Sequence, residues 1–187
     1  MHVAAAFVEH GVTPDVVPTA PKALAKVVFP SGVEANLGDE LAPTQVQNAP
    51  TVTWEFEPDT LYTIAFTDPD AYSRENPTVG EFEHWVVANI PGNDVSKGLI
   101  LSEYCGAGAP KGTGLHRYVF LVYKQSKKIE NVDTKIPRYQ IMRSIEKRMH
   151  WKVAKWAEEH GLSLVAGNFF QAQWDGYVPW IVNQAEP

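Results

Sequence analysis

Short runs of alternating apolar and polar residues occupy most of the first 125 positions of the chain. They are rich in Val, Ile, Phe, Tyr and Thr, and clusters of Pro, Gly, Asn and Asp separate them, as is typical of strands joined by turns. The pattern predicts strands over 22–29, 51–56, 61–67, 82–90, 115–123 and 166–174. Because no helical pattern lies between the first five, we expect antiparallel sheets packed as a β-sandwich.

Helical spacing is clearest near the C-terminus, over 150–160, where Trp151, Ala154 and the Trp156–Ala157 pair share one face and Gly161 follows as a stop signal. Residues 138–149 add further helical turns. There is no internal repeat, and no linker rich in Gly or Ser divides the chain. We therefore expect one mainly β domain over 1–187, with a few peripheral helices, chiefly near the C-terminus.

Composition narrows the class of protein. A chain of 187 residues with 44% hydrophobic residues can bury a substantial core, and a net charge of −6 opposes nucleic-acid binding, which depends on Lys and Arg. One cysteine, Cys105, allows no internal disulfide and few cysteine-based metal sites. The first ten residues do not resemble a signal peptide, and no apolar run is long enough to span a bilayer. We expect a soluble, cytoplasmic protein without a cofactor or metal.

Positive charge is concentrated in one segment. Residues 124–155 hold ten of the 16 Lys and Arg residues against three acidic residues, a local net charge of +7. A solvated helix and loop face explains this pattern in most proteins. The alternative is a docking face for an acidic partner, with weak contact to an anionic membrane through Arg143, Lys147 and Arg148.

Strand alternation places titratable groups on otherwise apolar faces. In the strand 61–68, one face carries Asp68 beside Tyr62, Ile64 and Phe66. In the strand 82–90, one face consists of Phe82, His84, Val86, Ala88 and Ile90. In the strand 115–123, one face carries His116 and Tyr118, followed by Phe120 and Val122. A single histidine on such a face is usually a core residue bonded to backbone. Three strands with the same layout instead indicate a shared pocket, since isolated burial would cost a few kcal/mol for each group.

Two connecting segments bear on this pocket. The glycine-rich run 106–114 directly precedes the His116 strand, and successive N–H groups in such a loop can hold an anion. It does not have the spacing of a phosphate-binding P-loop. Asp68-Pro69-Asp70 is either part of the site or an ordinary turn, and Asp-Pro pairs are frequent in turns.

These segments resemble motifs of the phosphatidylethanolamine-binding protein family, which includes the Raf kinase inhibitor proteins. Asp68-Pro69-Asp70-Ala71-Tyr72-Ser73-Arg74 is similar to the family's first motif and Gly112-Thr113-Gly114-Leu115-His116-Arg117-Tyr118-Val119-Phe120 to its second. The stretches 84–94, 167–172 and 177–179 are similar as well. The likeness extends over nearly the whole chain.

The resemblance implies a β-sandwich with one small pocket for phosphate-like anions or phospholipid headgroups. Its binding residues would be Asp68, His84, Gly108, Pro110, His116 and Tyr118. Asp68 would hold a histidine in one tautomer, while a histidine, Tyr118 and the glycine-loop N–H groups would hold the anion. Anion affinity should then fall as pH rises through the histidine range. The resemblance also implies a binding protein that modulates a signalling kinase or a serine protease, and not an enzyme.

Five positions depart from the family pattern. Tyr72 replaces a Pro at the pocket mouth, Glu83 replaces a second His beside His84, Ala107 and Ala109 replace Ser and Pro in the glycine loop, and Val182 replaces a pocket-side Tyr. Glu83 would add negative charge close to the anion. The alternative function is a phosphoester or ester hydrolase that uses the Asp and His residues as acid and base, although no Gly-x-Ser-x-Gly or His-Glu-x-x-His motif is present.

Overall fold

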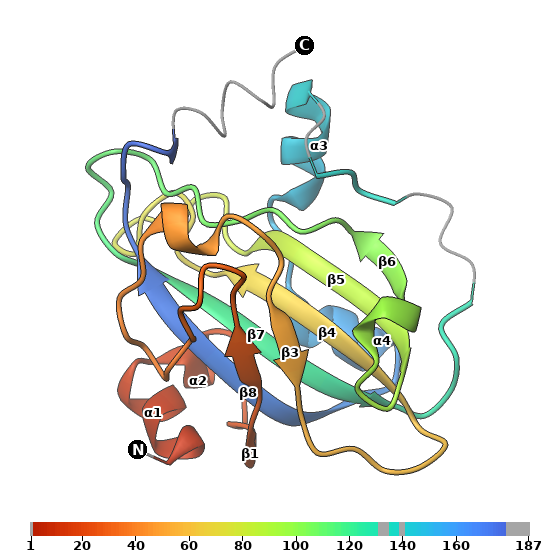
Figure 1. Ribbon diagram of the computed structural model, residues 1–187. Helices are drawn as coiled ribbons and strands as arrows, with labels where there is room; N and C mark the ends of the chain where they lie inside the picture. The colour runs from red at the N-terminus through yellow and green to blue at the C-terminus, as the bar shows by residue number, and fades with distance from the viewer. Residues whose placement is uncertain (1, 131–134, 139–140, 179–187) are drawn as a thin grey trace.

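A six-stranded sheet forms the centre of the computed structural model, which describes residues 2–130, 135–138 and 141–178, with only the backbone of 141–144 (Figure 1). The strand order is β1-β8-β7-β4-β5-β6. These strands span Ala23–Leu24 (β1), Leu162–Ala172 (β8), His116–Gln125 (β7), Leu61–Asp68 (β4), Phe82–Pro91 (β5) and Leu99–Ser102 (β6). The mainly β prediction is confirmed, but β6 was not predicted.

The sheet is mixed, because β1 runs parallel to β8 while all other neighbouring strands are antiparallel. The antiparallel-only prediction is therefore wrong. The predicted strand 22–29 divides at Ala25, after which β2 (Lys26–Val28) leaves the large sheet and pairs with β3 (Thr51–Thr53). The second sheet has only these two strands, so the two layers differ greatly in size and do not form the expected sandwich of antiparallel sheets.

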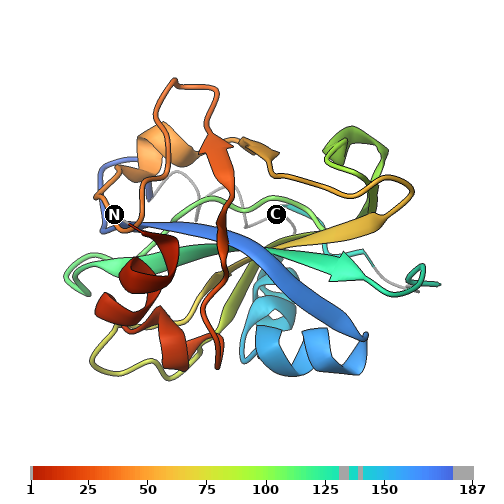
Figure 2. The same ribbon diagram turned by 90° about the horizontal axis from the view of Figure 1, so that it is seen from below.

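The large sheet lies between the small sheet on one side and helices on the other (Figure 2). The helical layer contains α4 (Val153–Glu159) and also α1 (Val3–Glu9) and α2 (Val12–Asp15), so two helices lie near the N-terminus, whereas helices were predicted chiefly near the C-terminus. Short 3-10 helices span Pro43–Val46 (η1) and Val95–Lys97 (η2), and α3 (Ile141–Arg148) stands at one end of the sheet. Within the described residues no helix is long and apolar enough to cross a membrane.

The two helices predicted from spacing are present at shifted bounds. The 150–160 pattern corresponds to α4, which begins three residues later, and Gly161 follows its C-cap with φ +63°, a conformation that suits glycine. The helical turns expected over 138–149 correspond to α3.

Both faces of the large sheet are buried, which explains why its central strands contain few solvent-facing positions. On the face toward β2 and β3, Phe66 and Phe120 stack with ring centroids 4.0 Å apart, and Phe170 packs beside them. On the opposite face Val119, Leu121 and Phe169 pack against α1, α2 and α4. Burial on both sides holds β4 and β7 at the centre of the fold.

Irregular pairing in β5 changes which of its side chains share a face. The register between β4 and β5 shifts between Phe66 and Thr67, so that Thr67 pairs with Glu83 and Phe66 with Trp85, and His84 is the extra residue. Beyond this bulge Trp85, Val87 and Ile90 join the face of Phe66. Val86 and Ala88 instead pack with Leu101 and Ile129. The predicted face is therefore wrong for Val86 and Ala88, whereas Ile90 lies on the side of Phe66, which His84 also contacts.

Candidate functional site

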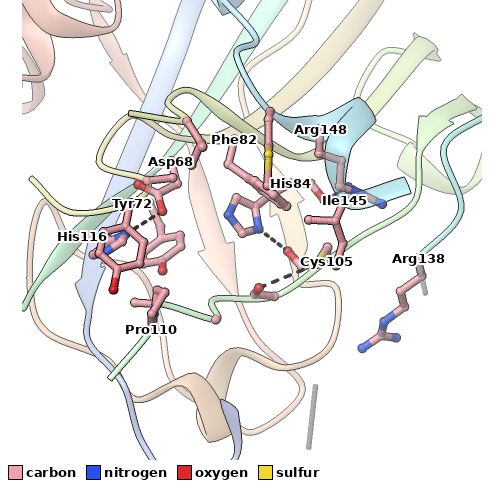
Figure 3. A pocket seen from close by; sticks show the side chains of 17 residues that line it. Asp68, Tyr72, Phe82, His84, Cys105, Pro110, His116, Arg138, Ile145 and Arg148 are labelled. Carbon is pink, nitrogen blue, oxygen red and sulfur yellow. Dashed lines mark hydrogen bonds and ion pairs between the residues drawn. The ribbon is translucent and has the colours of Figure 1, made fainter. Parts of the chain in front are cut away.

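A cavity of about 310 Å³ lies at the end of the large sheet where β4 stops and where β5 and β7 begin (Figure 3). Its polar base comes from these three strand ends, and the segment 105–110 and α3 complete its walls. All six residues predicted as ligand-binding line this one cavity: Asp68, His84, Gly108, Pro110, His116 and Tyr118. They meet because antiparallel neighbours bring the end of one strand beside the start of the next.

Asp68 and His116 form a buried pair at the base of the cavity. His116 Nδ1 donates to Asp68 Oδ2 at 2.8 Å, while the backbone N–H of Asp70 donates to Asp68 Oδ1 at 2.7 Å. Burial raises the pKa of Asp68, and the hydrogen bond from His116 opposes that rise. The carboxylate therefore holds His116 in one orientation, as the sequence suggested for one of the histidines.

Thr113 was missed by the sequence reasoning. Its hydroxyl lies 2.9 Å from His116 Nε2 and donates to Pro110 O at 2.8 Å. Gly112 and Gly114 on either side of it have φ of +82° and +74°, so they form the turn that directs Thr113 toward the histidine. Both ring nitrogens of His116 thus have protein partners. The spacing of three residues between Thr113 and His116 was the available sequence signal.

His84 presents a different nitrogen to the cavity. Its Nδ1 donates to Cys105 O at 2.6 Å, and its other nitrogen points away from Cys105, toward the side where Asp68 and His116 lie (Figure 3). Burial, together with the nearby charges of Arg148 and His116, lowers the pKa of His84 to about 3 against the opposing effect of its hydrogen bond to Cys105 O. Neutral His84 therefore offers a lone pair at Nε2. Binding of the anion by a charged imidazole stays a prediction, and the low pKa of His84 argues against that role for this residue.

Tyr118 supplies a hydroxyl beside His84, with the two ring centroids 5.4 Å apart. Burial and the negative charge of Asp68 raise the pKa of this hydroxyl well above its ordinary value, while hydrogen bonds with the backbone of Gly108 and Ala109 oppose the rise. A backbone group that lowers the pKa of a phenol is an N–H donor to its oxygen. The raised pKa means that Tyr118 keeps its phenolic proton, and the residue lines the cavity.

Arg148 lines the cavity as well, although the sequence analysis placed it on an exposed basic surface. Its side chain is buried, and its guanidinium donates to the backbone carbonyls of Glu83, His84, Glu103 and Pro137 at 2.8–3.1 Å. The predicted membrane contact is therefore wrong for Arg148, because α3 turns this residue inward. Lys147 is exposed, and the side chain of Arg143 lies outside the described part of the chain.

Glu83 faces away from the cavity. Strand alternation before the bulge turns its side chain to the opposite side of β5 from His84, where it accepts a hydrogen bond from Ser102 in a separate hollow lined by Val86 and Trp156. Burial raises the pKa of Glu83. The expectation that Glu83 places negative charge beside a bound anion is therefore wrong.

Asp70, the second acid of the Asp-Pro-Asp segment, has a structural contact. It accepts two hydrogen bonds from the guanidinium of Arg117, at 2.7 and 2.9 Å, and one from the Arg117 backbone N–H at 2.8 Å. Arg117 also donates to Asp15 and to His10 O. Both interpretations of the segment therefore hold: Asp68 faces the cavity, while Asp70 connects the 68–74 loop to β7 and the N-terminal helices.

The rest of the cavity wall is largely apolar and comes from side chains that the sequence reasoning did not assign to it: Ala71, Val79, Phe82, Ile145 and Met149. Tyr72 stands at the mouth with a relative exposure of 51% and also lines a second hollow with Arg74 and Thr113. Of the two alanines in the glycine loop, Ala109 lines the cavity and Ala107 packs in the core. Val182 lies outside the described residues.

The cavity contains little that would support metal or thiol chemistry. Over the described residues, no three His, Cys, Asp or Glu side chains are grouped so as to hold a metal ion. Burial raises the pKa of the Cys105 thiol, which opposes formation of a reactive thiolate. The cavity combines a polar base of donors and acceptors, a buried guanidinium and an apolar wall, a composition typical of small-molecule pockets.

These residues form a small pocket at one end of a mixed β-sheet. Comparison with known proteins agrees with it: residues 31–170 match the family model described as Phosphatidylethanolamine-binding protein. The chain belongs to this family, and the resemblance seen in its motifs is confirmed.

Individual relatives extend over most of the chain. The Drosophila melanogaster protein named "Putative odorant-binding protein A5" is 34% identical over 172 residues, which are 91% of this chain and 80% of that protein. A carboxypeptidase Y inhibitor, solved in complex with its cognate proteinase, has a TM-score of 0.78 at 29% identity and covers 92% of this chain and 95% of its own. The phosphatidylethanolamine-binding protein from Plasmodium vivax has a TM-score of 0.75 at 25% identity over 92% and 98%.

Proposed function

We propose that this protein binds one amphiphilic molecule with a phosphate-type headgroup, such as a phospholipid, in the 310 Å³ cavity. The observation that carries the proposal is the division of the cavity into a polar base and an apolar wall. Asp68, His84, Gly108, Pro110, His116 and Tyr118 would surround the headgroup, and Phe82, Ile145 and Met149 would contact the adjoining carbons. The buried charge of Arg148 would attract an anion, although four carbonyls already accept its N–H groups.

Replacing Tyr118 by phenylalanine tests this role of the base. Removal of the phenolic proton should weaken binding of a short-chain phosphatidylethanolamine about tenfold, the effect of one lost hydrogen bond in a desolvated site. Titration calorimetry at one pH would measure the affinity. The apolar contacts of the ring are retained, so the fold should be unaffected.

Tyr123→Phe is the matched control for this experiment. Tyr123 lies on the same strand but packs on the opposite face, and its buried hydroxyl is without a hydrogen-bond partner in the structure. Its loss should leave affinity unchanged and should not lower stability. Equal affinities for both variants and the parent protein would contradict the proposal, as would the absence of any saturable binding.

A second role, inhibition of a serine carboxypeptidase, is favoured by the similarity to the carboxypeptidase Y inhibitor over 92% of the chain. We expect the protein to reduce peptide hydrolysis by carboxypeptidase Y at a comparable molar concentration. Steady-state rates with increasing amounts of the protein would measure the inhibition. Full protease activity in a large molar excess would contradict this role. Modulation of a signalling kinase is the other role that the family resemblance suggests.

A further inference from the structure

The hydrogen-bonding capacity of the cavity base restricts what a headgroup can be, if the site binds headgroups as proposed. His84 has one nitrogen committed to Cys105 O, so its Nε2 can only accept. The Tyr118 hydroxyl, beside it, can donate. Asp68 carries two hydrogen bonds from the protein, and both nitrogens of His116 have partners. At this point of the base a ligand therefore meets the His84 acceptor and the Tyr118 donor side by side, and the carboxylate of Asp68 keeps further acceptor lone pairs.

A fully ionised anion fits this pair poorly. Its oxygens can accept from Tyr118, but an oxygen placed against His84 Nε2 would bring two lone pairs together and leave a buried acceptor unpaired. A phosphoryl group that keeps one proton satisfies both residues, because its P–OH donates to His84 and its other oxygen accepts from Tyr118. In a phosphodiester, the donor has to come from elsewhere, such as the ammonium of ethanolamine.

We infer that the cavity selects a ligand that brings its own proton, and that it favours a singly protonated phosphomonoester with a short apolar tail. The apolar tail would contact Phe82, Ile145 and Met149, which line the same cavity as the polar base. A volume of 310 Å³ holds about ten water-sized groups, which is enough for a headgroup and a few carbons.

The surrounding charges are consistent with this choice. The groups facing His84 are Asp68 from β4, His116 and Tyr118 from β7, Cys105 from the adjoining loop and Arg148 from α3. Arg138 also lines the cavity. Burial lowers the pKa of His84 to about 3, so between pH 6 and 8 this residue stays an acceptor. A single negative charge on the ligand is opposed by Asp68 and attracted by Arg148, and a second negative charge adds repulsion from Asp68.

Butyl phosphate and butyl sulfate provide the test, because they have the same shape and, at about pH 5, largely the same single charge, but only the phosphate carries a proton. We expect butyl phosphate to bind at least tenfold more tightly at that pH, measured by calorimetry on the full chain. Between about pH 6 and pH 8 its affinity should fall roughly 50-fold, since a phosphomonoester with a second pKa near 6 goes from about half to about one hundredth monoanion. Affinity for butyl sulfate should stay flat.

One further ligand and one variant test which parts of the cavity are responsible for the selectivity. Inorganic phosphate should bind at least tenfold more weakly than butyl phosphate, since burying each CH2 contributes about 0.8 kcal/mol. In His84→Gln the side-chain amide can turn and donate, so the preference for phosphate over sulfate should shrink toward one. His160→Gln is the control, because His160 Nδ1 also donates to a backbone carbonyl, that of Trp156, and His160 does not line the cavity.

Equal affinity for butyl phosphate and butyl sulfate in the parent protein would overturn the inference while leaving anion binding intact. A parallel loss of both affinities with rising pH would also overturn it, because a protein group would then be titrating. If no phosphate or phospholipid probe binds, the proposed function itself fails together with the inference.

Discussion

Replacing Arg148 by methionine is expected to lower the free energy of unfolding by about 3–5 kcal/mol, because several buried carbonyls lose their donor at about 1–3 kcal/mol each. Methionine keeps much of the length and apolar volume of the side chain but cannot donate. Carbonyls from β5, the segment after β6 and the segment before α3 would lose a charged donor. The His84 carbonyl would keep the hydrogen bond from the Cys105 backbone N–H. Denaturant unfolding would measure the change.

Lys147→Met is the control for this prediction. Lys147 is adjacent in the same helix and exposed, so the same substitution there should change stability by no more than about 0.5 kcal/mol. Ligand affinity should also fall in Arg148→Met, since α3 and the residue that follows it contribute Ile145 and Met149 to the cavity wall. Similar stabilities of the two variants would show that Arg148 belongs to the solvated basic face after all.

Substitution of Asp70 by asparagine should cost about 3–5 kcal/mol, because it leaves the buried Arg117 without its neighbouring charge. Burial alone would lower the pKa of Arg117, but the hydrogen bonds and charge of Asp70 raise it above its ordinary value. The pair is almost fully buried, with side-chain exposures of 4% for Arg117 and 2% for Asp70. Chemical unfolding is again the measurement.

Asp15 offers an internal comparison, since it contacts the same guanidinium at 2.8 Å but its side chain is 52% exposed. Asp15→Asn should cost only about 0–1 kcal/mol, the range for solvent-screened ion pairs. Equal losses for the two variants would mean that burial does not determine the strength of these interactions.

Much of the fold could be read from local patterns. Alternation identified β4, most of β5 and β7, because each has side chains repeating with a period of two and turn residues at its ends. The short strands were harder to predict from the sequence. Strand β6 has four residues, and its apolar Leu99-Ile100-Leu101 run shows no alternation. The switch between sheets at Ala25 had no signal, because one strand-like run, with Lys26 as its only charged residue after Lys22, serves β1 and β2.

The candidate site was partly predictable for the same reason. Asp68, His116 and Tyr118 occupy regular strand positions, so counting by two placed them on one face. His84 reached that face as well, but the bulge beside it separated it from Val86 and Ala88. A bulge depends on how two strands pair, and a single strand's sequence does not report it.

The sequence by itself determined the strand-end cluster of Asp68, His84, His116 and Tyr118, since side-chain direction along a strand follows from neighbouring positions. Only the tertiary structure decided that Arg148 is buried and that His84 is neutral. Arg148 could be buried because carbonyls from distant segments converge on it. Burial keeps His84 neutral, and the hydrogen bond from its Nδ1 to Cys105 O leaves Nε2 as the acceptor. These outcomes depend on groups 11 to 65 residues away for Arg148 and 21 away for His84, and burial magnifies them because few water molecules compete there.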